Sequence, residues 1–206
     1  MRQKGQASMK NTDLSKIRKA MEKAQDSKRY EHTLGVAYTA AALAMQHGAD
    51  INNSLIAGFL HDCAKQLSDE KKLHFCKKHN ISITTAEALN PSLLHAKVGG
   101  FIAMETYKVE DSDIINAILN HTTGRPEMSV LEKIIFIADY IEPGRKSAPN
   151  LTEIRKLAFT DLDKAMLVIL ADTLSYLKTT GMPIDQKTQM TYDYYLKLCK
   201  NGEKNE

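Results

Sequence analysis

The stretch LIAGFLHDCAKQL, residues 55–67, decides the fold. Its larger apolar side chains recur every three or four positions, which predicts a helix over about residues 52–66. His61 and Asp62 fall on the side of this helix opposite the apolar stripe. A solvated face would carry lysine, glutamate and glutamine, but here small residues such as Gly58 accompany the His-Asp pair. We therefore expect something to approach this face closely, the alternative being a His-Asp pair on the surface of a helix.

The rest of the chain repeats this helical period between separated glycines and prolines. No stretch alternates apolar and polar residues over the length of a strand, so we expect an all-α protein. Asp13 or Thr12 is a suitable first N-cap, Ser129 opens a capping box, and Gly48 and Gly181 are suitable residues to end helices. Helices are expected over about residues 12–26, 28–47, 52–66, 69–79, 84–90, 92–107, 111–121, 130–142, 151–159, 161–180 and 186–200.

The composition places the chain among globular proteins of one domain. It has 206 residues, of which 43% are hydrophobic and 26% are charged, as in a typical soluble protein. We expect an N-terminal helical extension over residues 1–25 and a main domain over residues 26–200. No run of 18 apolar residues is present, and the polar N-terminus lacks the apolar segment of a secretory signal.

Charge and cysteine content narrow the class of partners and the compartment. A net charge of +3 with scattered basic residues does not argue for nucleic acid. The 3 cysteines form no close pair, so a disulfide framework and a cysteine-based zinc site are not expected. A reducing compartment, the cytoplasm, follows from this pattern.

Asp139 is a polar residue that the helical pattern should not contain. Leu131, Ile135 and Asp139 lie at positions i, i+4 and i+8, on one face of a predicted helix. A carboxylate in an apolar stripe is costly unless it is paired or binds a metal. The alternatives are a buried salt bridge or a carboxylate that points outward at the helix end.

Three further histidines lie near core-facing stripes of other helices: His32, His95 and His121. A single histidine in such a place is more often a satisfied core or capping residue than a ligand. Together with the residues above, however, they make four histidines and two aspartates on five helices, which is the donor set of an oxygen and nitrogen metal site. Such a set suits iron, manganese or magnesium, with zinc possible. The remaining three histidines, His47, His74 and His79, are expected on the surface.

Three segments carry a resemblance to a known family: YEHTLGV at 30–36, LHDCAK at 60–65 and IADYIEPGR at 137–145. The ordered set of histidine, His-Asp and aspartate resembles the HD-domain metal-dependent phosphohydrolases. The wider segments resemble, within them, the YqeK family of symmetrical bis(5′-nucleosyl)-tetraphosphatases, over about residues 28–195. The resemblance implies an HD-type helical bundle that cleaves diadenosine tetraphosphate into two ADP by attack of a metal-activated water, with iron as the metal.

The resemblance also implies roles for individual residues. One ion would be bound by His32, His61, Asp62 and Asp139. Asp62 would bridge to a second ion completed by His95 and His121; without that ion, the two histidines would bind phosphate. Catalytic roles fall to Asp62, Lys65 and Arg145. Substrate contacts are expected from Gly35, Asp62, Lys65, His95, His121, Thr122 and Arg145, and from Thr188 and Tyr192 near the nucleoside.

Other functions remain open on the sequence. A 5′-nucleotidase or a deoxynucleoside triphosphate hydrolase would share the four basic ligands. Lys65-Gln66 stands where guanosine tetraphosphate hydrolases carry an acidic pair, and the Gly-Tyr-Pro motif of cyclic-dinucleotide phosphodiesterases is absent. A non-catalytic module that binds metal or nucleotide is the non-enzymatic alternative. The tyrosine-rich C-terminal helices are candidates for a homodimer contact.

Overall fold

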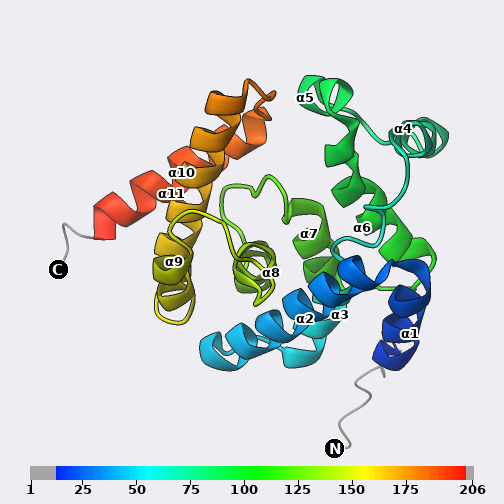
Figure 1. Cartoon of the computed structure of the whole chain (residues 1–206), viewed down its shortest axis with the longest axis horizontal. Helices are drawn as coiled ribbons and strands as arrows, with labels where there is room; N and C mark the ends of the chain where they lie inside the picture. Colours follow the sequence, from blue (N-terminus) through cyan, green and yellow to red (C-terminus); the bar gives the residue numbers. More distant parts are fainter. Residues whose placement is uncertain (1–12, 203–206) are drawn as a thin grey trace, which may run out of the picture.

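The computed structural model describes residues 13–202, and this part of the chain contains helices and no strands (Figure 1). The all-α prediction is therefore confirmed. The helices are α1 Leu14–Ala24, α2 Ser27–His47, α3 Ile51–Leu60, α4 Asp69–Lys78, α5 Thr85–Leu89, the 3₁₀ helix η1 Pro91–Leu94, α6 His95–Glu105, α7 Ser112–Asn120, α8 Val130–Ile141, α9 Leu151–Ala158, α10 Leu162–Thr180 and α11 Gln186–Gly202.

Several helix ends follow from the local residues that were expected to form them. Asp13 caps α1 by accepting from two backbone amides, whereas Thr12 lies outside the described residues. Ser129 and Glu132 form the expected capping box of α8. Gly48 and Gly181 end α2 and α10 in the left-handed conformation, which glycine adopts without steric cost.

Two predicted helices are wrong in their extent. The helix expected over 52–66 ends at Leu60 and is followed by turns, because Cys63 and Lys65 donate to carbonyls only three residues back. The helix expected over 92–107 is divided into η1 and α6. In both places a histidine ring, that of His61 or His95, forms a hydrogen bond with the carbonyl oxygen three residues earlier. The regular α-helix is therefore interrupted where a candidate ligand lies.

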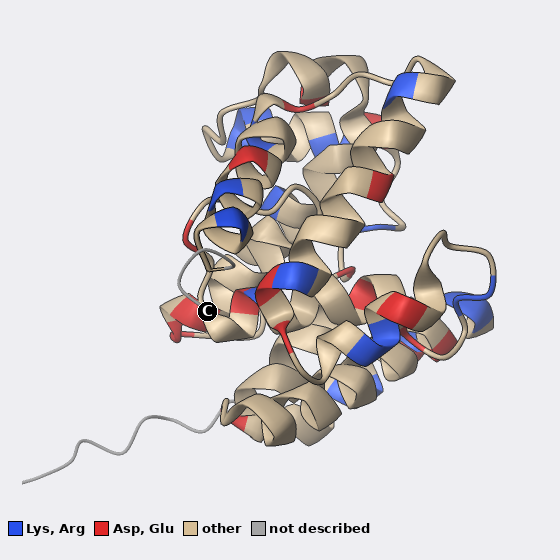
Figure 2. Cartoon of the chain, turned by 90° about the vertical axis from the view of Figure 1, so that its left-hand side faces the viewer, with Lys and Arg blue, Asp and Glu red and all other residues tan. Residues whose placement is uncertain are grey.

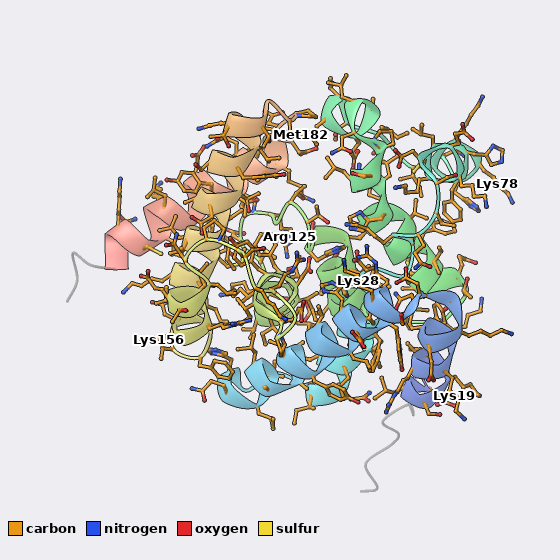
Figure 3. The ribbon with its side chains drawn as sticks, viewed as in Figure 1. Lys19, Lys28, Lys78, Arg125, Lys156 and Met182 are labelled. Carbon is orange, nitrogen blue, oxygen red and sulfur yellow. The ribbon has the colours of Figure 1, made fainter. Side chains whose placement is uncertain are left out.

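The middle of the molecule is formed by α2, α3, α7 and α8, with α9, α10 and α11 on one side and α4, α5 and α6 on the other (Figure 1). Side chains of these central helices fill the space between the ribbons (Figure 3). The helix α1 packs on the same core through the buried Ile17 and Met21. The residues predicted as an N-terminal extension therefore join the main core in their described part.

The small residues opposite the apolar stripe of α3 are buried, and this explains their size. A Cβ atom on Gly58 would lie 2.6 Å from the Cα atom of Ala37 in α2. The close neighbour expected on this face is thus the backbone of α2. His61 and Asp62, at the end of the same face, are buried and do not form a surface pair.

The surface prediction for the other histidines is correct for one of them. His74 is exposed. His47 is half-buried, with Nε2 2.7 Å from the carbonyl oxygen of Ala158. His79 is also half-buried, and its ring contacts those of Phe75 and Phe101. The surface prediction was based on positions at helix ends or among lysines. Such local features do not show whether a helix remote in sequence packs against the histidine ring.

Basic and acidic positions are interspersed over the ribbon in the view of Figure 2. None of the helices between residues 13 and 202 is long and apolar enough to cross a membrane.

Candidate metal centre

Three buried histidines lie at helix ends and are oriented by their own helical turn. His61 follows α3, His121 follows α7, and His95 follows η1. In each of them Nδ1 lies 2.6–2.7 Å from the carbonyl oxygen three residues earlier. Carbonyls in the last turn of a helix have no amide of a following turn to bond, so they can accept the ring proton. The Ser92 carbonyl accepts the backbone N–H of His95 as well. These ring contacts assign the proton to Nδ1 and leave Nε2 of each ring as a lone-pair donor.

Asp62 lies between two groups of histidines. Its Oδ1 is 3.2 Å from Nε2 of His95 and 3.6 Å from Nε2 of His121. Its Oδ2 is 3.6 Å from Nε2 of His61 and 3.9 Å from Nε2 of His32. One carboxylate therefore serves two sets of potential ligands, His32, His61 and Asp62 on one side and Asp62, His95 and His121 on the other.

Asp139 joins the first set through His32. Its Oδ1 lies 3.2 Å from Nε2 of His32 and 3.0 Å from Nη2 of Arg145. The carboxylate sits in the last turn of α8, half-buried beside apolar neighbours such as Ala138. The anomaly in the sequence of this helix is therefore a carboxylate that faces the histidine cluster.

The donor set fits a metal ion. Nε2 of His61 is fully buried and has no hydrogen-bond partner among the described residues. Nε2 of His95 and Nε2 of His121 lie 3.0 Å apart, although both rings hold their proton on the far nitrogen. Two lone pairs at this distance repel each other unless a cation lies against them. The Lys65 ammonium lies against His95, and a metal ion bound by both rings and the Asp62 carboxylate would serve the two lone pairs together.

The charges of Asp62 and His61 suit metal binding. Burial alone would raise the pKa of Asp62, but His61, His121 and His95 together hold it well below its usual range. Burial lowers the pKa of His61 to about 4. The carboxylate is therefore ionised and this imidazole is neutral at pH 7, which are the states that bind a metal.

The pair of His32 and Asp139 behaves differently. Burial disfavours the charged form of His32, but contacts with Asp139 and Glu142 outweigh it and raise the pKa of the ring. Burial would raise the pKa of Asp139, yet the hydrogen bond with His32 and the nearby His61 hold it below its usual range. Each residue thus favours the charged form of the other, with Nε2 of His32 3.2 Å from Oδ1 of Asp139.

Three basic side chains surround the cluster. Arg29 lies 2.8 Å from Oδ2 of Asp62, and Lys65 lies 3.2 Å from Nε2 of His95. Arg145 donates hydrogen bonds to Oδ1 and to the backbone carbonyl of Asp139. These groups give the rim of the site positive charge, which suits a phosphate-bearing ligand.

Of the hollows that Arg145 lines, two also contain predicted ligands, His32 in one and His121 and Asp139 in the other. The larger, of about 790 Å³, has the size of a small-molecule site. The smaller, of about 180 Å³, opens beside the cluster between α8 and α10. The larger is lined by Asp26, Lys28, Arg29, Glu31, His32, Gly35, Glu142, Pro143, Gly144, Arg145 and Lys146. The smaller is lined by His121, Thr122, Phe136, Asp139, Tyr140, Arg145, Ala148, Ile169 and Thr173.

The structure brings most of the predicted site residues together, with two exceptions. Thr122 lies at the cluster, with Oγ1 3.3 Å from Nε2 of His121. Thr188 is buried in α11, and Tyr192 packs against the hydrophobic core. Neither residue lines the two hollows. Gly35 lines the larger hollow, but the space beside it is filled by the side chain of Glu142.

Sequence reasoning missed Arg29 and Glu142. Arg29 lies three residues before His32 on α2, and residues at this spacing share a helix face, so a helical projection could have found it. Glu142 touches His32 across 110 residues of sequence, and no local pattern indicates such a pair.

Comparisons with known proteins agree with this geometry. The sequence profile of the HD domain family matches residues 29–144. The protein of Bacillus subtilis (strain 168) named bis(5′-nucleosyl)-tetraphosphatase, symmetrical, is 40% identical over 166 residues, which cover 81% of this chain and 88% of the relative. The protein of the same name from Staphylococcus aureus is 33% identical and covers 89% of this chain and 94% of the relative.

A solved structure from Clostridium acetobutylicum shares the fold. It is described as a "predicted HD superfamily hydrolase involved in NAD metabolism" and is 39% identical to this chain. The superposition has a TM-score of 0.86 and covers 90% of this chain and 97% of the other. The chain therefore belongs to the HD domain family and, within it, to the family of the symmetrical bis(5′-nucleosyl)-tetraphosphatases.

Proposed function

We propose that this enzyme hydrolyses diadenosine tetraphosphate symmetrically into two molecules of ADP. The observation that carries the proposal is the position of Asp62 between two sets of histidines, with one carboxylate oxygen toward each set. The relatives named bis(5′-nucleosyl)-tetraphosphatase support the substrate.

In this proposal His32, His61, Asp62 and Asp139 hold one metal ion, and Asp62, His95 and His121 hold a second. Iron is the proposed metal because the family resemblance implies it. The donor set of imidazole and carboxylate without thiolate also suits manganese or magnesium. When bound, the ions lower the pKa of water and withdraw electron density from phosphoryl oxygens.

The basic residues act on the phosphate chain. Lys65 and Arg145 now pair with His95 and Asp139, and both can exchange these partners for phosphate oxygens when substrate and metal arrive. Phosphoryl transfer depends mainly on positioning and on positive charge around the transferred group. Arg145 lines both hollows, so it lies where the middle of a long phosphate chain would cross from one to the other.

This arrangement supports cleavage at the centre of the substrate. The larger hollow, between α2 and the loop after α8, has room for one nucleotide half. The smaller hollow leads away on the side of α10, past Thr122. With the two halves on opposite sides of Arg145, the central phosphoanhydride would lie beside Asp139, which Arg145 contacts.

The test uses purified protein loaded with iron(II) under anaerobic conditions or with manganese(II). Diadenosine tetraphosphate is added, and the products are separated by ion-exchange chromatography. We expect ADP as the sole nucleotide product. ATP and AMP in equal amounts would contradict symmetrical cleavage, and faster turnover of mononucleotides would favour a 5′-nucleotidase or a deoxynucleoside triphosphate hydrolase.

Assembly and localisation stay predictions. Tyr176, Met190 and Leu198 of α10 and α11 are exposed and are proposed to contribute to a homodimer, which light scattering after size exclusion would detect. A cytoplasmic location follows only from the cysteine content.

A further inference from the structure

Glu142 is a buried carboxylate that the proposed reaction does not use. It follows the last residue of α8, with a side chain that is 6% exposed. One carboxylate oxygen, Oε1, lies 3.2 Å from Nδ1 of His32. The other, Oε2, accepts a hydrogen bond from the backbone amide of Gly144. Both oxygens are thus engaged, and one of them faces a proposed metal ligand.

Two glycines make the space for this carboxylate. A Cβ atom on Gly35 would lie 2.7 Å from Oε2 of Glu142, and one on Gly144 would lie 2.9 Å from both carboxylate oxygens. Neither glycine has a positive φ angle, so the backbone conformation does not require glycine at either position. What these positions require is the absence of a side chain, and Glu142 occupies the space that results.

The backbone around Glu142 is held by one guanidinium group. Arg155 of α9 donates through Nε to the carbonyl of Ile141 at 3.0 Å. Its Nη2 donates to the carbonyls of Glu142, at 3.0 Å, and Arg145, at 3.1 Å. The last turn of α8 and the loop after it are therefore clamped on both sides of the carboxylate.

His32 needs a side-chain partner of this kind because of its place in α2. It lies in the second turn of a helix of 21 residues, where the backbone carbonyls already accept intrahelical hydrogen bonds. No helix end lies in its own turn, whereas the Nδ1 protons of the other three rings go to carbonyls at helix ends. A carboxylate from another part of the chain supplies the acceptor.

We infer that Glu142 is the positioning residue of His32: it accepts the Nδ1 proton and so directs the Nε2 lone pair toward the metal beside Asp62 and Asp139. Gly35 and Gly144 serve the same contact by leaving room for the carboxylate. The inference rests on the proposed function in one respect, namely that His32 is a metal ligand. A carboxylate behind a ligating histidine fixes the ring and strengthens it as a ligand.

The test measures the affinity of the metal-free protein for manganese(II) by isothermal titration calorimetry. We expect Glu142→Ala to weaken binding by about 10–100-fold, as is typical when the partner behind a ligating histidine is lost. Glu142→Gln keeps an oxygen acceptor of the same length and should recover most of the affinity. Gly35→Ala should reproduce the defect of Glu142→Ala, and the two changes combined should cost no more than either alone.

Gly99→Ala is the matched control, because a Cβ atom there would meet its nearest neighbour at 3.5 Å, an ordinary contact. It should bind manganese(II) like the wild type. Circular dichroism verifies that each variant is folded; if Glu142→Ala fails to fold, Gly35→Ala and Glu142→Gln carry the test.

Two outcomes separate the inference from the proposed function. If His32→Ala binds manganese(II) as tightly as the wild type, the proposed ligand set is wrong. If His32→Ala weakens binding but Glu142→Ala and Gly35→Ala do not, the ligand set stands and the role of Glu142 is wrong. A Gly35→Ala variant with unchanged metal affinity and a raised KM would show that Gly35 contacts the substrate and does not act through Glu142.

Discussion

His61, His95 and His121 are oriented by carbonyls of their own helical turn, whereas His32 is oriented by a side chain 110 residues away. The first three lie where a helix ends, and a carbonyl of its last turn accepts the ring proton. His32 lies inside α2, where the carbonyls are occupied. A histidine at a helix end can thus be oriented by local backbone alone, whereas a histidine inside a helix is oriented by a side chain from another element.

The largest loss of metal affinity is expected for Asp62, which faces both His32 and the locally oriented histidines. Asp62→Ala removes the carboxylate that faces both sets of histidines, so affinity for both ions should fall by more than about 100-fold, beyond the loss caused by removing a residue behind a ligand. Turnover should fall to background. Calorimetry with manganese(II) and the ADP assay measure both quantities.

Asp69→Ala is the control for Asp62→Ala, since Asp69 forms a salt bridge with Lys72 away from the cluster. It should retain affinity and turnover. Full activity of Asp62→Ala would show that the catalytic centre lies elsewhere.

The second effect is a pH-dependent loss of stability caused by the buried His61. Its pKa in the folded protein is about 4, against about 6.5 in the unfolded chain. The unfolded chain therefore binds more protons between these values, so stability is lost as pH falls from about 6.5 to about 4, by roughly 3 kcal/mol. Urea unfolding of metal-free protein at several pH values measures this loss.

His61→Gln is the reference for the pH series, because glutamine does not titrate. The difference in unfolding free energy between the two proteins should shrink or change sign toward acid pH. A constant difference from pH 7 to pH 4 would mean that burial does not hold His61 neutral.

A smaller effect is expected from the clamp that supports His32. Arg155→Met removes the donor of three hydrogen bonds to the loop after α8 and should lower the free energy of unfolding by about 2 kcal/mol, the scale of hydrogen bonds from a charged group. Because the clamp holds Glu142 and Arg145, KM should rise as well. Steady-state kinetics and urea unfolding check both. Unchanged stability and unchanged KM together would show that the loop holds its shape without Arg155.

The smallest loss of stability is expected for His47, whose ring is hydrogen-bonded to a carbonyl outside the metal centre. His47→Leu removes the hydrogen bond between α2 and the carbonyl of Ala158 and should cost about 1 kcal/mol, or a fall in Tm of roughly 2–4 °C for a chain of this size. His74→Leu, at an exposed position, should leave Tm within error. Equal Tm values for the two variants would mean that the His47 contact contributes nothing.

Much of the site was predictable because ligands stand out against a helical pattern. Asp139 interrupts an apolar stripe, and His61 and Asp62 accompany small residues that pack on α2. The residues that support the ligands were not predictable in this way. Glu142 and Arg155 look like surface charges in the sequence, since their partners lie on elements far along the chain.

The sequence by itself determined the helices, most of their caps and the set of donor residues, because helix formation and capping depend on residues within about four positions of each other. Only the tertiary structure decided that α3 ends at Leu60, that Gly35 makes room for Glu142, and that Thr188 and Tyr192 lie away from the two hollows. These features depend on how helices that are remote in sequence pack against one another. Burial then sets which polar groups must be paired, and a periodic pattern along one helix does not contain that information.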